Sequence, residues 1–122
     1  MSELDISLRD SQTSYAPGDT VVGAVQWNLQ TNPRRLDVTL LWYTAGKGTR
    51  DVGVIETVAI ENPGSLGSQD FAFALPYGPY SFSGRLISLI WVIELTSAPG
   101  EQTVRQEITV SPTGEEIVLG GH

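Results

Sequence analysis

Turn-forming residues interrupt this sequence at short, nearly regular intervals. Each turn contains proline, which presets φ, glycine, which permits a positive φ, or an Asx residue, which hydrogen-bonds its own backbone. Segments bounded so closely by turns favour β-strands and leave no room for helices. The turns lie at residues 16–19, 31–33, 45–48, 61–64, 76–79, 98–100 and 111–114.

The segments between the turns are rich in β-branched and aromatic residues, which favour strands. Several also alternate apolar and polar residues with the period of two that a half-buried strand requires, as Val21, Val25 and Trp27 do on one face of their segment. About seven short strands without a helical period predict an all-β, immunoglobulin-like antiparallel sandwich, with an open barrel as the alternative. The strands are expected near residues 4–9, 20–29, 36–45, 52–61, 69–75, 84–97 and 102–111.

The length of 122 residues suits a single domain. We assign residues 1–113 to that domain and residues 114–122, which end in Gly-Gly-His, to a flexible C-terminal tail. No apolar stretch reaches the roughly 18 to 20 residues that a membrane-spanning helix needs, and the start of the chain does not resemble a secretory signal. We therefore expect a cytoplasmic protein with no membrane insertion.

One predicted strand, at residues 86–93, carries large apolar residues on both faces, and residues 40–43 do so more weakly. Such a strand is costly unless both faces are covered. The cover is either a loop or terminal segment of the same chain, or a partner, which is another protein or a second copy. The candidate partner surface consists of Leu86, Ser88, Ile90 and Val92.

Two motifs in the chain resemble the arrestin family. The first starts at Tyr15 and continues through a Pro-Gly-acidic turn into a strand that begins Val-x-Gly-x-Val. The second is a Phe-x-Leu-Pro strand end at residues 73–76, followed by a Pro- and Gly-containing turn and an apolar strand with a tryptophan. The two motifs keep the family's order, so the resemblance covers residues 4–111. Their fold-setting positions are Pro17, Gly18, Asp19, Gly23, Pro76, Pro79, Gly84 and Trp91.

The resemblance implies an arrestin-like β-sandwich and a non-catalytic role as an adaptor or scaffold, similar to microbial sporulation-control relatives. Relatives typically pair two such domains, whereas this chain carries one, and a homodimer is one way in which a solitary domain covers the apolar strand. The chain lacks the basic phosphate-sensing clusters of the receptor-regulating members. No functional residue is therefore carried over from them.

The composition argues against catalysis. The chain has no cysteine, and its one histidine is the terminal His122, so neither a thiolate nucleophile nor a hydrolytic triad is available. The carboxylate pairs Glu56–Glu61 and Asp10–Asp19 lie beside turns and on strands, where nothing supplies the burial that raises a carboxyl pKa. The net charge of −7 disfavours nucleic acid. We predict no enzymatic activity, no cofactor, no metal site and no nucleic-acid binding.

Three aromatic residues cluster around one predicted turn: Tyr77, Tyr80 and Phe82. Aromatic side chains on the rim of a β-sandwich can stack on sugar rings, so a carbohydrate-binding module is the alternative function. The competing interpretation is that these side chains cap the end of the sandwich by packing against Trp91 or Phe73. The preferred prediction is a protein–protein interaction module.

Overall fold

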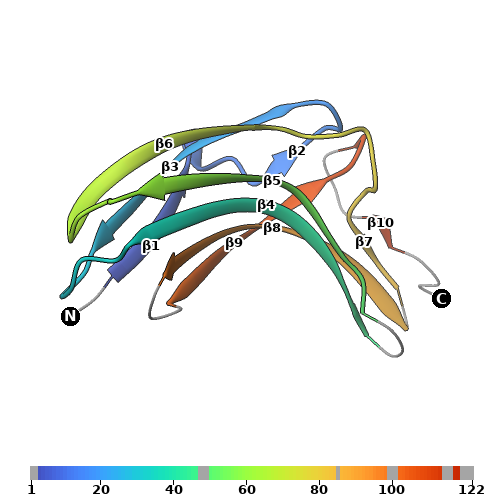
Figure 1. The fold of residues 1–122 in the computed structure, drawn as a ribbon. Coiled ribbons are helices and arrows are strands. Elements are labelled where there is room, and N and C mark those ends of the chain that lie inside the picture. Colours follow the sequence, from blue (N-terminus) through green and yellow to red (C-terminus); the bar gives the residue numbers. More distant parts are fainter. Residues whose placement is uncertain (1–2, 47–49, 85, 99–101, 114–116, 119–122) are drawn as a thin grey trace.

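The computed structural model describes residues 3–46, 50–84, 86–98, 102–113 and 117–118. These residues form strands and a single turn of 3-10 helix, which confirms the predicted all-β class (Figure 1). In chain order the elements are β1 (Glu3–Leu8), η1 (Arg9–Ser11), β2 (Ser14–Tyr15), β3 (Thr20–Asn28), β4 (Arg35–Gly46), β5 (Val52–Glu61), β6 (Leu66–Ala74), β7 (Phe82–Ser83), β8 (Ile87–Ala98), β9 (Thr103–Val110) and β10 (Ile117–Val118).

The strands form two sheets, a small one of β1, β3 and β6 in that order and a large one centred on β8. One edge of β8 pairs with β4, and β5 lies outside β4. The other edge of β8 pairs with β7 near its start and with β9 further along. The short strands β2 and β10 extend the large sheet through parallel pairs with β9 and β7. Both layers curve in the same sense, so that the molecule forms an arch in Figure 1.

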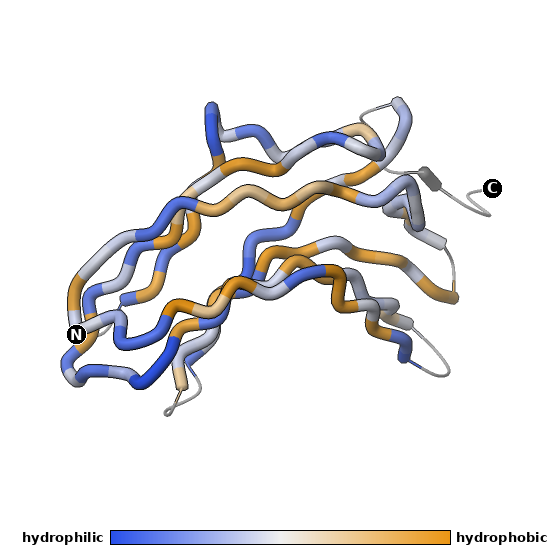
Figure 2. The backbone as a smooth tube through the Cα atoms, turned by 45° about the horizontal axis from the view of Figure 1, so that its top comes forward, coloured by the Kyte–Doolittle hydropathy of each residue, from blue (hydrophilic) through white to orange (hydrophobic). Residues whose placement is uncertain are grey.

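The core lies between the two sheets and follows the alternation predicted from the sequence. Val21 and Val25 of β3 are fully buried, as are Trp91 and Ile93 of β8. These side chains belong to one continuous apolar cluster that draws on both sheets. Figure 2 shows the hydrophobic positions, in orange, along the strands of both layers. The packing of two apolar inner faces is what makes this a sandwich.

Two of the predicted strand starts are wrong by three residues, and the other predicted boundaries agree to within one residue. β6 begins at Leu66 although the sequence predicts a start at residue 69, and β8 begins at Ile87 although it predicts a start at residue 84. The early start of β6 has a cross-strand cause, because Gly67 pairs with Trp27 of β3 and lies directly against its indole ring. Local sequence favours a loop at Gly67-Ser68, and the neighbouring strand overrides that preference.

Of the predicted C-terminal tail, residues 117–118 form β10 and pair with β7. The other residues of 114–122, His122 included, lie outside the described residues. The described residues contain no helix that is long and apolar enough to span a membrane.

The first arrestin-like motif forms a closed turn that joins the sheet strands around it. Gly18 has a φ of 86°, and the neighbouring Asp19 accepts a hydrogen bond from the Ala16 N–H through Oδ2 at 2.9 Å. The backbone carbonyl of Asp19 accepts a second hydrogen bond from the Leu75 N–H at 2.9 Å. A Cβ at Gly23 would collide with the β1 backbone, so β1 can approach only because this residue is glycine.

Candidate interaction surface

The outer face of the large sheet carries an apolar patch that spans three neighbouring strands. The odd-numbered residues of β8 from 89 to 95 belong to the core, so the even-numbered residues point to the outer face. The register places Leu41 of β4 opposite Val92, and Tyr43 opposite Ile90. On β5, Val54 and Val52 lie opposite those two β4 residues. We call these six side chains the concave patch: Leu41, Tyr43, Val52, Val54, Ile90 and Val92.

The concave patch has a covered centre and an open edge. At its centre Val92 is 2% exposed and Leu41 is 8% exposed. At its β5 edge Val52 and Val54 are 57% and 61% exposed. The apolar surface that water reaches is therefore concentrated at β5.

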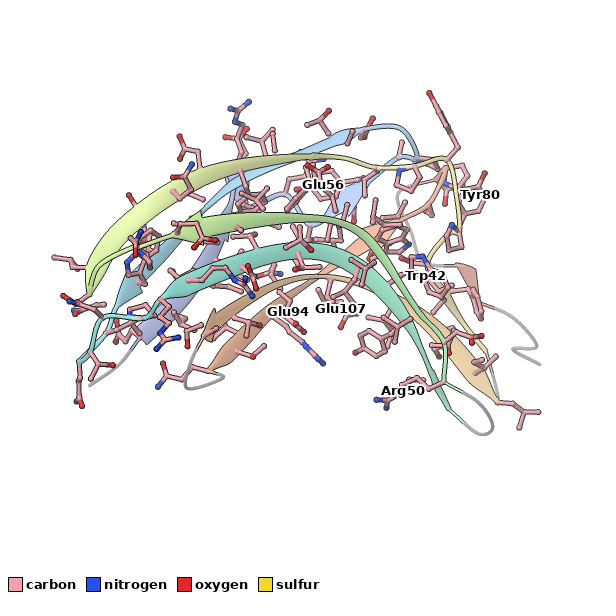
Figure 3. All side chains as sticks on the ribbon, viewed as in Figure 1. Trp42, Arg50, Glu56, Tyr80, Glu94 and Glu107 are labelled. Atoms are coloured by element: carbon pink, nitrogen blue, oxygen red, sulfur yellow. The ribbon has the colours of Figure 1, made fainter. Side chains whose placement is uncertain are left out.

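Charged side chains border the patch beneath the arch in Figure 3. The Arg105 Nε lies 2.7 Å from the Glu94 Oε2. The same guanidinium stands 5.8 Å from the centre of the Tyr43 ring, and the Arg50 guanidinium stands 6.0 Å from it, both within cation–π range. Glu107 lies opposite Val92 in the register of β9. Long side chains of the sheet itself thus screen the middle of the patch.

The candidate partner surface predicted from β8 alone is only partly assembled. Ser88 and Ile90 lie half-buried on the outer face, whereas Val92 is buried and cannot itself contact a partner. Leu86 precedes β8 and is 65% exposed at the end of the sheet.

In Figure 1 the large sheet is the lower layer, and among the described residues no segment other than its own strands lies beneath it. The predicted cover by a loop or terminal segment is therefore not present among these residues. The sequence signalled the β4 members of the patch weakly through the run at residues 40–43. It did not single out Val52 and Val54.

Of the predicted rim aromatics, Tyr77 and Tyr80 lie in the connection between β6 and β7, and Phe82 is the first residue of β7. Tyr77 is 81% exposed and Tyr80 is 38% exposed, whereas Phe82 is half-buried and packs against the core. The connection is held from within the sandwich, because the Trp91 Nε1–H donates a hydrogen bond to the Pro79 carbonyl at 3.0 Å. The Tyr77 ring lies over Gly18, where a Cβ would be 2.8 Å from its Cε1.

The remaining motif positions lie close to this connection. Pro76 follows β6 and is half-buried, and Gly84 lies half-buried between β7 and β8. Ser81 is buried, and its hydroxyl accepts a hydrogen bond from the Val110 N–H at 2.9 Å. The second motif therefore fixes the backbone that leads into the central strand.

The carboxylate pairs considered for catalysis are all exposed. Glu56 and Glu61 lie on β5, Asp10 lies in η1, and Asp19 lies in the turn before β3. Among the described residues no three His, Cys, Asp or Glu side chains gather as a metal site would require. Two open hollows lie on the outer face of the small sheet, one beside Gln26 and Asn28 and the other beside Val22 and Ala24.

Comparison with known proteins shows which solved structures have a similar fold. No protein-family model matches the chain, and no curated protein matches its sequence. The solved structure of Spo0M, a sporulation control protein from Bacillus subtilis, matches with a TM-score of 0.64 and 21% identity. The match covers 90% of this chain and 49% of Spo0M, so the chain spans about half the length of that protein.

Two structures of β-glucosidase from Listeria innocua also align with the chain. Their TM-scores are 0.47 and 0.49, with identities of 12% and 11%, and each alignment covers 16% of the glucosidase. A likeness this slight carries no argument about the present chain. The match to Spo0M confirms at the level of fold what the two sequence motifs predicted: this chain is an arrestin-like antiparallel β-sandwich.

Proposed function

We propose that this chain is a non-catalytic interaction module that binds another protein through the concave patch. The observation that carries the proposal is the exposed apolar edge of the patch, where Val52 and Val54 retain more than half of their exposure. Contiguous exposed apolar surface rimmed by charged groups is typical of protein-binding sites. Spo0M is described as a sporulation control protein, which supports a regulatory role for a chain of the same fold.

The charged border fits the same role. Arg50 and Arg105 bring positive charge close to the Tyr43 ring, and Glu94 pairs with Arg105. An interface with exposed apolar side chains beside charged groups gains contact energy from the apolar side chains and orientation from the charges.

The first test measures the patch directly with an apolar-surface dye and the solution mass of the same sample by light scattering. We expect a monomer whose dye fluorescence falls in Val54→Ser and in Ile90→Ser. Leu66→Ser is the matched control, because Leu66 is 72% exposed but lies on β6 of the other sheet. The control should leave the dye signal unchanged.

The second test asks whether a protein binds there. A partner that is captured by the wild type and by Leu66→Ser, and lost in Val54→Ser, supports the proposal. Equal capture by all three chains contradicts it. A dimer that binds no dye assigns the patch to a second copy of the chain.

The carbohydrate-binding alternative has a specific observation in its favour, since Tyr77 and Tyr80 are both exposed on the same connection. A glycan titration followed by intrinsic fluorescence tests it, with Tyr77→Ala as the variant that should abolish any response. No change in fluorescence with any glycan removes this alternative.

A further inference from the structure

The outer edge of β5 is open along its whole length. Among the described strands β5 pairs only with β4. It is also the longest edge strand of the two sheets, with 10 residues against 9 in β6 and 6 in β1. An edge strand directs the N–H and C=O groups of alternate residues outward, where an incoming strand can pair with them.

The usual devices that block strand edges are sparse on β5. Its sequence contains no Lys, Arg or Pro, the residues with which natural edges are commonly protected. Val52, Val54 and Ile55 are 57%, 61% and 38% exposed. The one irregularity is a bulge at Ile55 of β5, because Leu40 pairs with Glu56 and the next β4 residue, Leu41, pairs with Val54. The pairing of residues 56–61 is continuous beyond it.

The charge along β5 selects between partners. Asp51 precedes the strand, and Glu56 and Glu61 lie within it. The ion pairs formed by the described residues are Arg35–Asp37 and Arg105–Glu94. Asp51, Glu56 and Glu61 therefore form no ion pair with another described residue. The chain as a whole carries a net charge of −7. A strand that brings Lys or Arg gains from this charge, whereas an acidic strand is repelled.

A second copy of the chain fits this edge poorly. Glu56 lies at the middle of β5, so a two-fold antiparallel pair of β5 strands brings two Glu56 carboxylates close together. Like charges on facing strands destabilise the pair. The two chains also repel each other through their net charges.

The inner side of β5 indicates what else the partner needs. Val58 and Ile60 are half-buried and pack against the core from this edge. A strand added beside them extends the apolar layer if its own side chains on that face are apolar.

We propose that the free edge of β5 binds an extended segment of another protein in which β-branched apolar residues alternate with Lys or Arg. The proposal rests on the proposed function as an interaction module and names the strand and the partner chemistry. The register places Val58 and Ile60 opposite core residues of β4, and Glu61 opposite Arg35 on the outer face. The apolar residues of the added strand therefore lie beside Val58 and Ile60 on the inner face, and its basic residues lie on the outer face, where one pairs with Glu61.

The test uses labelled synthetic peptides of about ten residues, the length of β5, in which Val and Lys alternate. Fluorescence anisotropy should show that the Val-Lys peptide binds at least about tenfold more tightly than a Val-Glu peptide, an advantage that falls with added salt. Glu61→Lys should reverse the order of the two peptides. Asp70→Lys is the matched control, because it makes the same charge change at an exposed site on β6.

Backbone methylation separates strand addition from charge attraction alone. Two further Val-Lys peptides carry N-methyl groups at odd or at even positions, so that only one of them loses the N–H groups that pair with the edge. One peptide should bind as before and the other should fail. Equal binding of both, or a Glu61→Lys chain that still prefers the Val-Lys peptide, overturns the inference.

The outcome also separates this inference from the proposed function. Ile90→Ser alters the dye signal of the concave patch and should leave peptide affinity unchanged. If no peptide binds while the dye and capture results hold, the inference about the edge is wrong and the interaction role stands. Dimerisation at neutral pH that Glu56→Lys abolishes would assign the edge to a second copy and would also overturn the inference.

Discussion

Tyr15 shows how one residue of the first motif contributes to both packing and polarity. It is 4% exposed, and its hydroxyl donates a hydrogen bond to the Gln12 carbonyl at 2.9 Å. Burial raises the pKa of the Tyr15 phenol above its ordinary value of 10.0, because the charged phenolate is poorly solvated there. The folded state therefore holds this proton more firmly than the unfolded state does.

That difference predicts an alkaline loss of stability. The stabilising contribution is fully present below pH 10, the ordinary value, and is lost as the pH rises through the raised pKa. Tyr15→Phe should lower the free energy of unfolding by about 1 kcal/mol at neutral pH, through the lost hydrogen bond, and should flatten the alkaline decline. Urea denaturation at several alkaline pH values measures both effects. Tyr77→Phe, at an exposed tyrosine, is the control and should keep the wild-type decline.

The tryptophans Trp27 and Trp91 are both buried but differ in hydrogen bonding. The Trp91 Nε1–H donates to Pro79, whereas the Trp27 Nε1 is buried with no hydrogen-bond partner among the described residues. Replacement by phenylalanine removes a similar volume at both sites. Trp91→Phe should therefore destabilise the fold by about 1–2 kcal/mol more than Trp27→Phe, since it also leaves the Pro79 carbonyl without its donor. Equal losses in thermal or urea unfolding would contradict this assignment.

At the scale of the strand, the edge strands β5 and β6 share one feature: each contains a glycine that pairs with a tryptophan of the neighbouring strand. Gly53 on β5 pairs with Trp42, and Gly67 on β6 pairs with Trp27. In each pair the indole ring lies on the glycine, so that an added Cβ would collide with it. An aromatic side chain that covers a glycine on an edge strand compensates for the missing side chain of the glycine.

Adding a Cβ at either glycine should therefore displace the tryptophan ring that lies on it. Gly53→Ala and Gly67→Ala should each lower the free energy of unfolding by about 1–3 kcal/mol, the usual cost of overpacking. Gly78→Ala is the control, because a Cβ there meets nothing within 4 Å, and its effect should stay within about 0.5 kcal/mol. Denaturant unfolding monitored by tryptophan fluorescence reports stability and the indole environment together. A loss no larger than that of the control would show that the rings move aside freely.

The sequence predicted the long strands because their period and turns are local signals. The alternation in β3 was visible in Val21 and Val25, and both are fully buried. The start of β6 and the Trp–Gly pairs could not be predicted, since they depend on which strand lies beside which. For the same reason the sequence predicted only part of the candidate surface. The apolar run of β8 was visible, but only the register shows that Val92 is buried beside Leu41 and that the open part of the patch lies on β5.

At the scale of the whole molecule, the net charge of −7 opposes self-association through the exposed edge of β5. A long apolar edge invites self-association, and the mutual repulsion of like-charged chains opposes it. The sequence pI is about 4.4, so this repulsion disappears as the pH falls toward that value. The open edge of β5 and the concave patch are present in every copy, and nothing then opposes their contact.

We therefore expect a monomer near neutral pH and reversible association as the pH approaches 4.4, the sequence pI. Val54→Lys should reduce this association, because it places a charge on the open apolar edge. Tyr77→Lys adds the same charge at an exposed loop residue away from β5, so it controls for the change in net charge. Light scattering across the pH range measures the mass of all three chains. If Val54→Lys associates as strongly as Tyr77→Lys, the contact lies elsewhere on the molecule. The net charge then prevents self-association through a surface other than β5.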